Sequence, residues 1–315
     1  MHLSKYHLAI LSITLCTIIW NAASPFVKWS IQDTPPFTIA FFRFLIATLI
    51  MFPFMIKNNR LAIRFEDFYK LFLLAITGLT FNLGLYYLGL SLSQSINAPI
   101  IASMIPIFLI FGSIFFLHEN PKKKALCGTI VSLIGVGIII FRPIHAISQA
   151  GSILGNVYLL LSVISLVSYT ILLKKFKLKY PSTTIIFWIF LIATITFFPA
   201  FIIQNHKINI HEIVSFQGSI GILYGAILSS LLGQVLYNYS VKHLKANEVG
   251  IFTYLGPVVT ALVAIPLLHE QITFSYLLGS LFVFLGLFIS EVKLHYPIFH
   301  HHFTNVDDSW LESGP

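Results

Sequence analysis

The chain has 315 residues, of which 57% are hydrophobic and only 10% are charged, and its mean hydropathy is +0.87. A water-soluble domain carries about 25% charged residues, so this chain cannot cover its surface in water and is expected to lie largely in a lipid bilayer. The net charge of +8 resides in short connections between apolar stretches, a pattern of membrane topology that argues against a nucleic-acid partner.

Ten apolar stretches, each about as long as a membrane-spanning helix, follow one another along the chain. A helix crosses the hydrocarbon core in about 20 residues, and the connections are too short to hold a soluble domain. The expected fold class is therefore an all-α membrane protein. The predicted spans are 8–27, 36–56, 69–90, 96–117, 124–141, 152–173, 183–203, 216–240, 249–268 and 274–292.

The first span has an alternative interpretation. Lys5 precedes an apolar stretch that ends in Asn21-Ala22-Ala23, which also fits a secretory signal peptide with a small-residue cleavage site. The internal repeat described below gives this span a partner in the second half, and this favours a retained helix.

The Lys and Arg residues indicate the orientation. If the N-terminus is cytoplasmic, 15 of the 19 lie on the cytoplasmic side, three lie on the outer side, and Arg43 lies within a span. Cytoplasmic loops are enriched in Lys and Arg. We therefore expect a multi-pass protein of a bacterial inner membrane with both termini in the cytoplasm.

The sequence contains an internal repeat. The segment that begins at residue 86 resembles the segment that begins at residue 237, at a shift of 151 residues and without a gap. Farther upstream, residues 45–48 match residues 191–194 at a shift of 146. The two shifts pair Tyr86 with Tyr237, Pro106 with Pro257, Glu119 with Glu270, and Lys28 with Lys174.

Each half of the chain holds five predicted spans. Because five is odd, the second half must cross the membrane in the opposite sense to the first. Inverted repeats are typical of secondary transporters, whose two conformations open to opposite sides of a site near the midplane. The expected units are residues 1–143, residues 150–295 and a polar, disordered cytoplasmic tail at 296–315.

At these residues the chain resembles the drug/metabolite transporter superfamily, and within it the family with two EamA repeats. The likeness rests on Arg43 in span two, on the Glu that closes spans four and nine, and on the glycines of the following helices, Gly128, Gly135, Gly279 and Gly286. It covers roughly residues 8–292. The resemblance implies ten helices around a central cavity that carries a small metabolite, with exporters and importers both among its members. The chain departs from symmetry at Ile189, which stands where the first half has Arg43.

Arg43 is the cation that the sequence places within a span, roughly 12 Å from the start of the helix at 1.5 Å per residue. A cation at that depth is expected to face a cavity or a polar partner. Both a substrate carboxylate and neighbouring carbonyl groups fit this expectation. No Asp or Glu lies in the middle third of a predicted span, so facilitated movement or exchange is favoured over proton coupling.

Polar and aromatic side chains within the spans are the predicted lining of the substrate cavity. Amide groups in lipid need hydrogen-bond partners, so their helix faces should point inward, where they either meet substrate or bond to one another across helices. The candidates are Trp20, Asn21, Ser24, Arg43, Asn82, Tyr86, Tyr87, Asn97, Tyr169, Trp188, Gln234, Tyr237, Asn238 and Tyr254.

Two further pairs of positions have structural predictions. Pro106 and Pro257 are expected in the middle of spans four and nine, where each breaks a backbone bond, and Gly256 loosens the second one further; they are the hinge candidates. Glu119 and Glu270 are expected at helix ends, accepting hydrogen bonds from the free N–H groups of the helix that follows.

The leading hypothesis is a secondary-type transporter, not an enzyme, for a small organic metabolite. An amino-acid-like solute and export are slightly favoured. The alternatives are import of a nucleotide-like or vitamin-like cofactor and, in different classes, a membrane-embedded enzyme or a receptor. The two cysteines have no ligand spacing, so no metal and no cofactor are expected, and monomer and homodimer both remain open.

Overall fold

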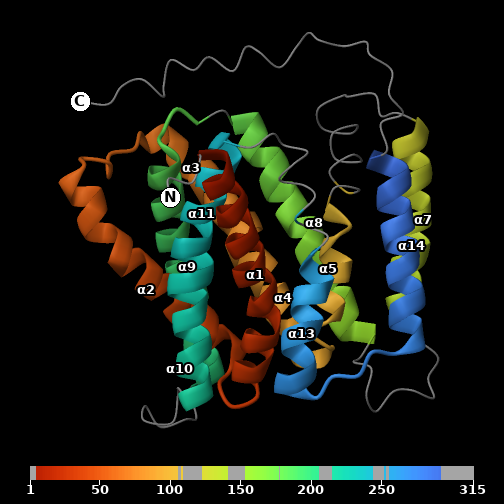
Figure 1. Ribbon diagram of the computed structural model, residues 1–315. Coiled ribbons are helices and arrows are strands. Elements are labelled where there is room, and N and C mark those ends of the chain that lie inside the picture. The colour runs from red at the N-terminus through yellow and green to blue at the C-terminus, as the bar shows by residue number, and fades with distance from the viewer. Residues whose placement is uncertain are drawn as a thin grey trace.

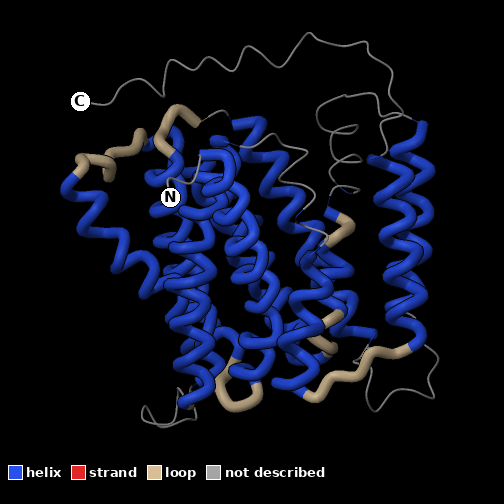
Figure 2. The backbone as a smooth tube through the Cα atoms, in the orientation of Figure 1, coloured by secondary structure: helices blue, strands red, loops and turns tan. Residues whose placement is uncertain are grey.

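The computed structural model describes residues 5–105, 108, 123–140, 153–176, 178–205, 215–243, 252 and 255–291. The regular elements within these residues are helices, which stand side by side in one bundle (Figures 1 and 2). Most of the connecting loops lie at the two ends of the bundle (tan in Figure 2). The predicted tail at 296–315 lies outside the described residues.

The helices of the first half follow the predicted spans. In chain order they are α1 (Lys5–Ile31), α2 (Pro36–Lys57), the continuous stretch α3 (Phe65–Ala75), η1 (Ile76–Phe81) and α4 (Asn82–Leu92), then α5 (Asn97–Ala102) and α7 (Lys123–Ile140). Local chemistry accounts for their limits. Pro36 opens α2, where its missing N–H costs nothing, and Asn59, just past its end, takes a left-handed backbone.

The second half repeats this order. Its helices are α8 (Ile153–Phe176), α9 (Ser182–Asn205), the continuous stretch α10 (Phe216–Leu223), η4 (Tyr224–Leu232) and α11 (Gly233–His243), then α13 (Gly256–Leu268) and α14 (Phe274–Glu291). Ser215 caps α10 by accepting a hydrogen bond from the N–H of Gly218.

Six of the ten predicted spans coincide with helices that are long and apolar enough to cross a membrane. These helices cover Lys5–Ile31, Pro36–Lys57, Phe65–Leu92, Ile153–Leu173, Ser182–Asn205 and Phe216–Tyr237. Within the other four predicted spans, the described residues form the shorter helices α5, α7, α13 and α14. The all-helical class is confirmed, and the count of ten spans stays a prediction.

The helices of one half pack mainly on those of the other. Helix α2 packs on α9, α5 on α13, and α7 on α14, while α4 packs on α8 and α1 packs on η4 and α11. Exchanging the two halves maps this set of pairs onto itself, as a two-fold relation between them requires. Stacked rings fill part of the interface, such as Phe44 on Phe197, whose ring centroids are 6.0 Å apart.

Two wide, π-helical segments interrupt the third and eighth predicted spans. Segment η1 covers residues 76–81 and segment η4 covers residues 224–232. The repeat shift of 151 carries 76–81 onto 227–232, which lie inside η4. Such π segments are frequent at functional sites, so their recurrence in both halves directs attention to the helices they contact.

Glycines lie at the contact between α7 and α14. A side chain at Gly279 would come within 2.5 Å of Ile139 Cγ1 and 2.7 Å of the carbonyl oxygen of Gly135. Glycine therefore permits the close backbone approach at this crossing, which is a common device of helix packing in lipid.

Candidate functional site

Arg43 lies buried inside the bundle, with 8% of its surface exposed. Its guanidinium donates three hydrogen bonds to hydroxyl groups: Nε to Ser230 Oγ at 3.1 Å, Nη1 to the Tyr87 hydroxyl at 3.0 Å, and Nη2 to Ser229 Oγ at 3.1 Å. The guanidinium carbon also lies 5.6 Å from the ring centroid of Phe44. We call Arg43, Tyr87, Ser229 and Ser230 the arginine cluster.

In the described part of the chain, the hydrogen-bond partners of Arg43 are neutral hydroxyl groups, and no carboxylate forms an ion pair with it. The ion pairs found there are Lys28–Glu270 and Lys70–Asp67, and neither includes Arg43. A guanidinium has five N–H donors, and the three bonds to hydroxyls use three of them. A carboxylate or phosphate group would supply both the missing charge and acceptors for the other two donors.

Segment η4 builds this site. Ser229 and Ser230 belong to η4, and so does Gly225, which lies directly beside the Arg43 side chain. A Cβ atom at Gly225 would stand 2.8 Å from Arg43 Cδ and 3.2 Å from Cγ. Glycine is thus what lets Arg43 reach across from α2 to the two serines.

An aromatic pair adjoins the arginine cluster. The indole N–H of Trp20 donates to the backbone oxygen of Ser229 at 2.9 Å, and the Trp20 and Tyr237 rings lie 5.2 Å apart at 35°. Gly233 lies against the Trp20 indole nitrogen. One serine therefore joins Arg43 through its hydroxyl and Trp20 through its carbonyl.

Other predicted lining residues also converge on this region from α1 and α4. Tyr86 lies next to Tyr87 and forms a hydrogen bond with Ser24. Asn21 donates to the carbonyl of Thr17 at 2.9 Å, and its side-chain oxygen lies against Gly256 at the start of α13. Helices α1, α4 and α13, which come from both halves, therefore contribute to this region.

The remaining predicted lining residues lie elsewhere or outside the described part. Asn82 donates to the carbonyl of Ser162 at 2.7 Å, Trp188 donates to that of Leu61 at 3.2 Å, and Tyr169 lies against Gly78 of η1. Asn97 donates to Ser93 and Asn156, both at 3.1 Å. Gln234 lies in α11; the side chain of Asn238 and the whole of Tyr254 fall outside the described residues.

The structure describes two hinge candidates, Gly256 and Pro257, and one helix-end candidate, Glu270, and their arrangement differs in detail from the predicted one. Helix α13 begins at Gly256, so Pro257 lies in its first turn instead of the middle of a helix, where a proline costs no backbone bond. The hinge role of Gly256 and Pro257 stays a prediction. The carboxylate of Glu270 accepts from the backbone N–H groups of Ser95 and Ile96, ahead of α5, and not from the helix that follows it. Pro106 and Glu119 lie outside the described residues.

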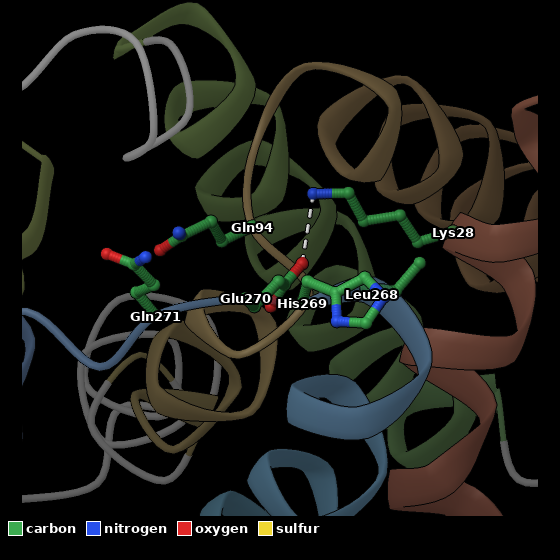
Figure 3. Close-up of a pocket in the computed structure, with 6 residues that line it drawn as sticks. All are labelled: Lys28, Gln94, Leu268, His269, Glu270 and Gln271. Atoms are coloured by element: carbon green, nitrogen blue, oxygen red, sulfur yellow. Dashed lines mark ion pairs between the residues drawn. The ribbon is translucent and has the colours of Figure 1, made fainter.

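A pocket of about 230 Å³ opens at the end of the bundle where α1 and α13 finish (Figure 3). The predicted lining residues do not border it. Its wall consists of Lys28, Gln94, Leu268, His269, Glu270 and Gln271. Figure 3 shows Lys28 extended toward Glu270 across this pocket.

Several residues of the site were not singled out by the sequence. Ser229 and Ser230 sit in an apolar stretch, and the repeat pairs them with Gly78 and Leu79, so neither spacing nor recurrence marks them. Lys28 served only for the topology and for the repeat. The recurrence of Lys28 as Lys174, beside that of Glu270 as Glu119, is a signal that could have linked the two.

Comparison with known proteins places the chain in a family. The model of the EamA-like transporter family matches residues 7–141 and 153–291. An uncharacterized transporter of Archaeoglobus fulgidus is 27% identical over 93% of this chain and 99% of its own length. An S-adenosylmethionine uptake transporter of Rickettsia bellii is 25% identical over 78% of this chain and 80% of its own.

The fold is found in a solved structure as well. A crystal structure that covers 91% of this chain and 98% of its own matches with a TM-score of 0.60 at 14% identity. The family model matches most of the chain, in two copies that correspond to the two halves of the bundle. The chain belongs to the EamA-like transporter family, within the drug/metabolite transporter superfamily.

Proposed function

We propose that this protein is a secondary carrier for a small organic metabolite that bears an acidic group, and that the acidic group binds at the arginine cluster. The carrier has ten spans in two inverted halves, with both termini in the cytoplasm of a bacterial cell. It alternates between conformations that open the site to opposite sides of the membrane.

The arginine cluster is the observation that carries this proposal. A buried cation is costly in a membrane, and it is usually paired or functional. Arg43 is held by three hydroxyl groups and by no described carboxylate, so an anionic substrate group would complete its coordination. The position has no symmetric partner, because the second half has Ile189 there.

Helix interruptions support a site between the two halves. The described part of α5 ends at Ala102, and α13 begins at Gly256. The repeat shift of 151 carries position 102 onto position 253, which is three residues before the start of α13. Paired interruptions in corresponding helices of two inverted halves mark the binding site of many carriers. Asn21 lies against Gly256, which sets this interruption beside the aromatic pair.

The substrate class follows from the groups near Arg43. A carboxylate matches the guanidinium, and a planar ring matches the Trp20–Tyr237 pair through stacking. An amino-acid-like solute with a ring meets both requirements. A second candidate is S-adenosylmethionine itself, the substrate named for the Rickettsia relatives, because it joins an amino-acid carboxylate to a nucleoside base.

Comparative metabolite profiling tests the proposal. Cells and medium are compared between the intact protein and the double variant Arg43→Ala, Trp20→Ala at matched membrane levels. Arg60→Ala is the matched control, because this arginine lies in an exposed loop, where it contacts Thr183. We expect a compound with a carboxylate to change sides only with the intact protein and the control, and its direction of movement identifies export or import.

Two results would contradict the proposal. The first is an unchanged distribution of every compound, with the intact protein correctly inserted. The second is transport of a purely cationic or neutral solute that persists in the double variant. The first would bring the receptor or enzyme alternatives forward, and the second would show a carrier whose substrate does not bind at the arginine cluster.

A further inference from the structure

An ion pair lines the pocket shown in Figure 3. Lys28, near the end of α1, and Glu270, just after α13, approach within 3.0 Å. Their side chains are 20% and 5% exposed, respectively. The pair is thus largely withdrawn from water, where its attraction is less screened than at a surface, and where loss of one partner strands the other charge.

The same two side chains hold the connection between α4 and α5. Glu270 accepts from the backbone N–H of Ser95 at 2.6 Å, from its hydroxyl at 3.1 Å, and from the N–H of Ile96 at 3.1 Å. Lys28 donates to the carbonyl of Ser93. The ion pair therefore ties three separate segments together: the end of α1, the end of α13 and the α4–α5 connection.

A neighbouring set of amides attaches this connection to a further helix. The hydroxyl of Ser93 donates to the side-chain oxygen of Asn156 in α8, and Asn97 donates to the same oxygen at 3.1 Å. Of the joined helices, α1, α4 and α5 belong to the first half, and α8 and α13 belong to the second. The contact thus spans the boundary across which the halves must move.

The ion pair is connected to the arginine cluster through α1 and α4. Ser24 is four residues before Lys28, about 6 Å along the same face of α1. Ser24 contacts Tyr86, and the next residue, Tyr87, binds Arg43. The pocket itself is lined by Lys28 and Glu270.

We propose that the Lys28–Glu270 pair is a latch that keeps the outer end of the carrier closed in this conformation. Opening that end requires the pair to separate, which would join the pocket to the path toward Arg43. The backbone groups of Ser95 and Ile96 stay available to receive Glu270 again, so the latch is reversible. This inference rests on the proposed carrier function, but its test needs no substrate.

Cysteine labelling from outside intact cells tests the latch. The reporter is Ser24→Cys in a protein that also carries Cys16→Ala and Cys127→Ala, treated with a membrane-impermeant maleimide. Lys28→Met and Glu270→Gln each remove one charge of the pair, whereas Lys28→Arg keeps it. Asp67→Asn is the matched control, because Asp67 pairs with Lys70 at 2.6 Å at the opposite end of the bundle.

We expect Lys28→Met and Glu270→Gln to raise the labelling rate of the reporter at least about fivefold, the population change that a modest loss of stabilisation produces. Lys28→Arg and Asp67→Asn should leave the rate within about twofold. Labelling that stays unchanged in both Lys28→Met and Glu270→Gln, at matched membrane levels, would overturn the latch.

A second reporter separates opening from general loosening. The native Cys16, buried on α1, lies two turns farther from Lys28 than Ser24 and is tested in the Cys127→Ala protein. It should remain unlabelled when Lys28→Met is added. Equal labelling of Cys16 and of the Ser24→Cys reporter would mean that the ion pair merely supports the fold, and would contradict the proposal. If the labelling rates change as expected for the latch but no metabolite is transported, the result counts against the proposed function and not against the latch.

Discussion

Replacing Gly225 by Ala adds one methyl group where the Arg43 side chain crosses η4. The new Cβ would lie 2.8 Å from Arg43 Cδ, whereas ordinary contact begins at 3.4 Å, so the arginine must move by about 0.6 Å to restore normal packing. Its three hydrogen bonds are now 3.0 to 3.1 Å long. A shift of that size takes at least one of them beyond the usual limit of about 3.2 Å.

The energetic cost can be set against the gain from removing a glycine. A hydrogen bond to a charged group contributes about 1.5–3 kcal/mol, and Ala in place of Gly returns about 0.5–1 kcal/mol in a helix. The expected net destabilisation is about 1–2 kcal/mol. Gly137→Ala in α7 is the matched control, because a Cβ there meets nothing within 4 Å, and it should be neutral or slightly stabilising.

The assay is the thermal unfolding midpoint of the detergent-solubilised protein, together with transport of the identified substrate at matched membrane levels. Gly225→Ala should unfold at a lower temperature than Gly137→Ala and should carry substrate more slowly. If Gly225→Ala matches the control in midpoint and the wild type in transport, the geometry assigned to the arginine cluster is refuted.

Three further substitutions test other parts of the structure. Arg43→Lys should lower transport at least about tenfold while membrane levels hold, since a compact ammonium cannot replace a planar guanidinium fork; undiminished transport would contradict a bidentate anion site. Gly279→Ala should reduce folded protein and its unfolding midpoint, at a cost of about 1–3 kcal/mol, because the added atom meets the backbone oxygen of Gly135 at 2.7 Å; a normal yield would refute the close packing of α7 on α14. Asn82→Ala, which removes the bond to the carbonyl of Ser162, should impair transport more than membrane level, and equal losses of both would leave Asn82 a structural residue only.

The positions of the long helices could be predicted because length and apolar composition determine them directly. The predicted span 183–203 corresponds to α9 at Ser182–Asn205, and 36–56 corresponds to α2 at Pro36–Lys57. In lipid, the backbone has few alternatives to a helix. The sequence therefore predicted these helices without any knowledge of how they pack.

The partners of Arg43 could not be predicted in the same way. The depth of Arg43 in span two indicated that it needs polar partners. In the sequence, however, Ser229 and Ser230 cannot be distinguished from serines whose hydroxyl groups bond to carbonyls of their own helix. Their orientation toward Arg43 depends on the wide turns of η4, and a π turn leaves no mark in apolar periodicity. The sequence therefore indicated the cation of the site but not its hydrogen-bond acceptors.

Glu270 illustrates a second limit. Its place at the end of a helix was predicted, and the expected acceptor role was assigned to the next helix in the chain. His269 adopts a left-handed backbone with φ of 53°, which is uncommon for a residue with a side chain. The backbone turn at His269 directly precedes Glu270. The partners of Glu270 come from the connection before α5, and the residues next to Glu270 in the sequence do not indicate these partners.

The wide turns of η1 and η4 also constrain how the length of the chain can vary. Each residue of an α-helix turns the following side chains by about 100°, so deleting one residue at most positions of a span would rotate everything beyond it. Within η4, the loss of one residue could be absorbed by converting a wide turn into an ordinary one. Ser229 and Ser230 would then lose their alignment with Arg43, while Tyr237 could keep its place against Trp20. A single-residue deletion there would therefore yield a folded protein with an altered site, unlike the same deletion in the middle of α9.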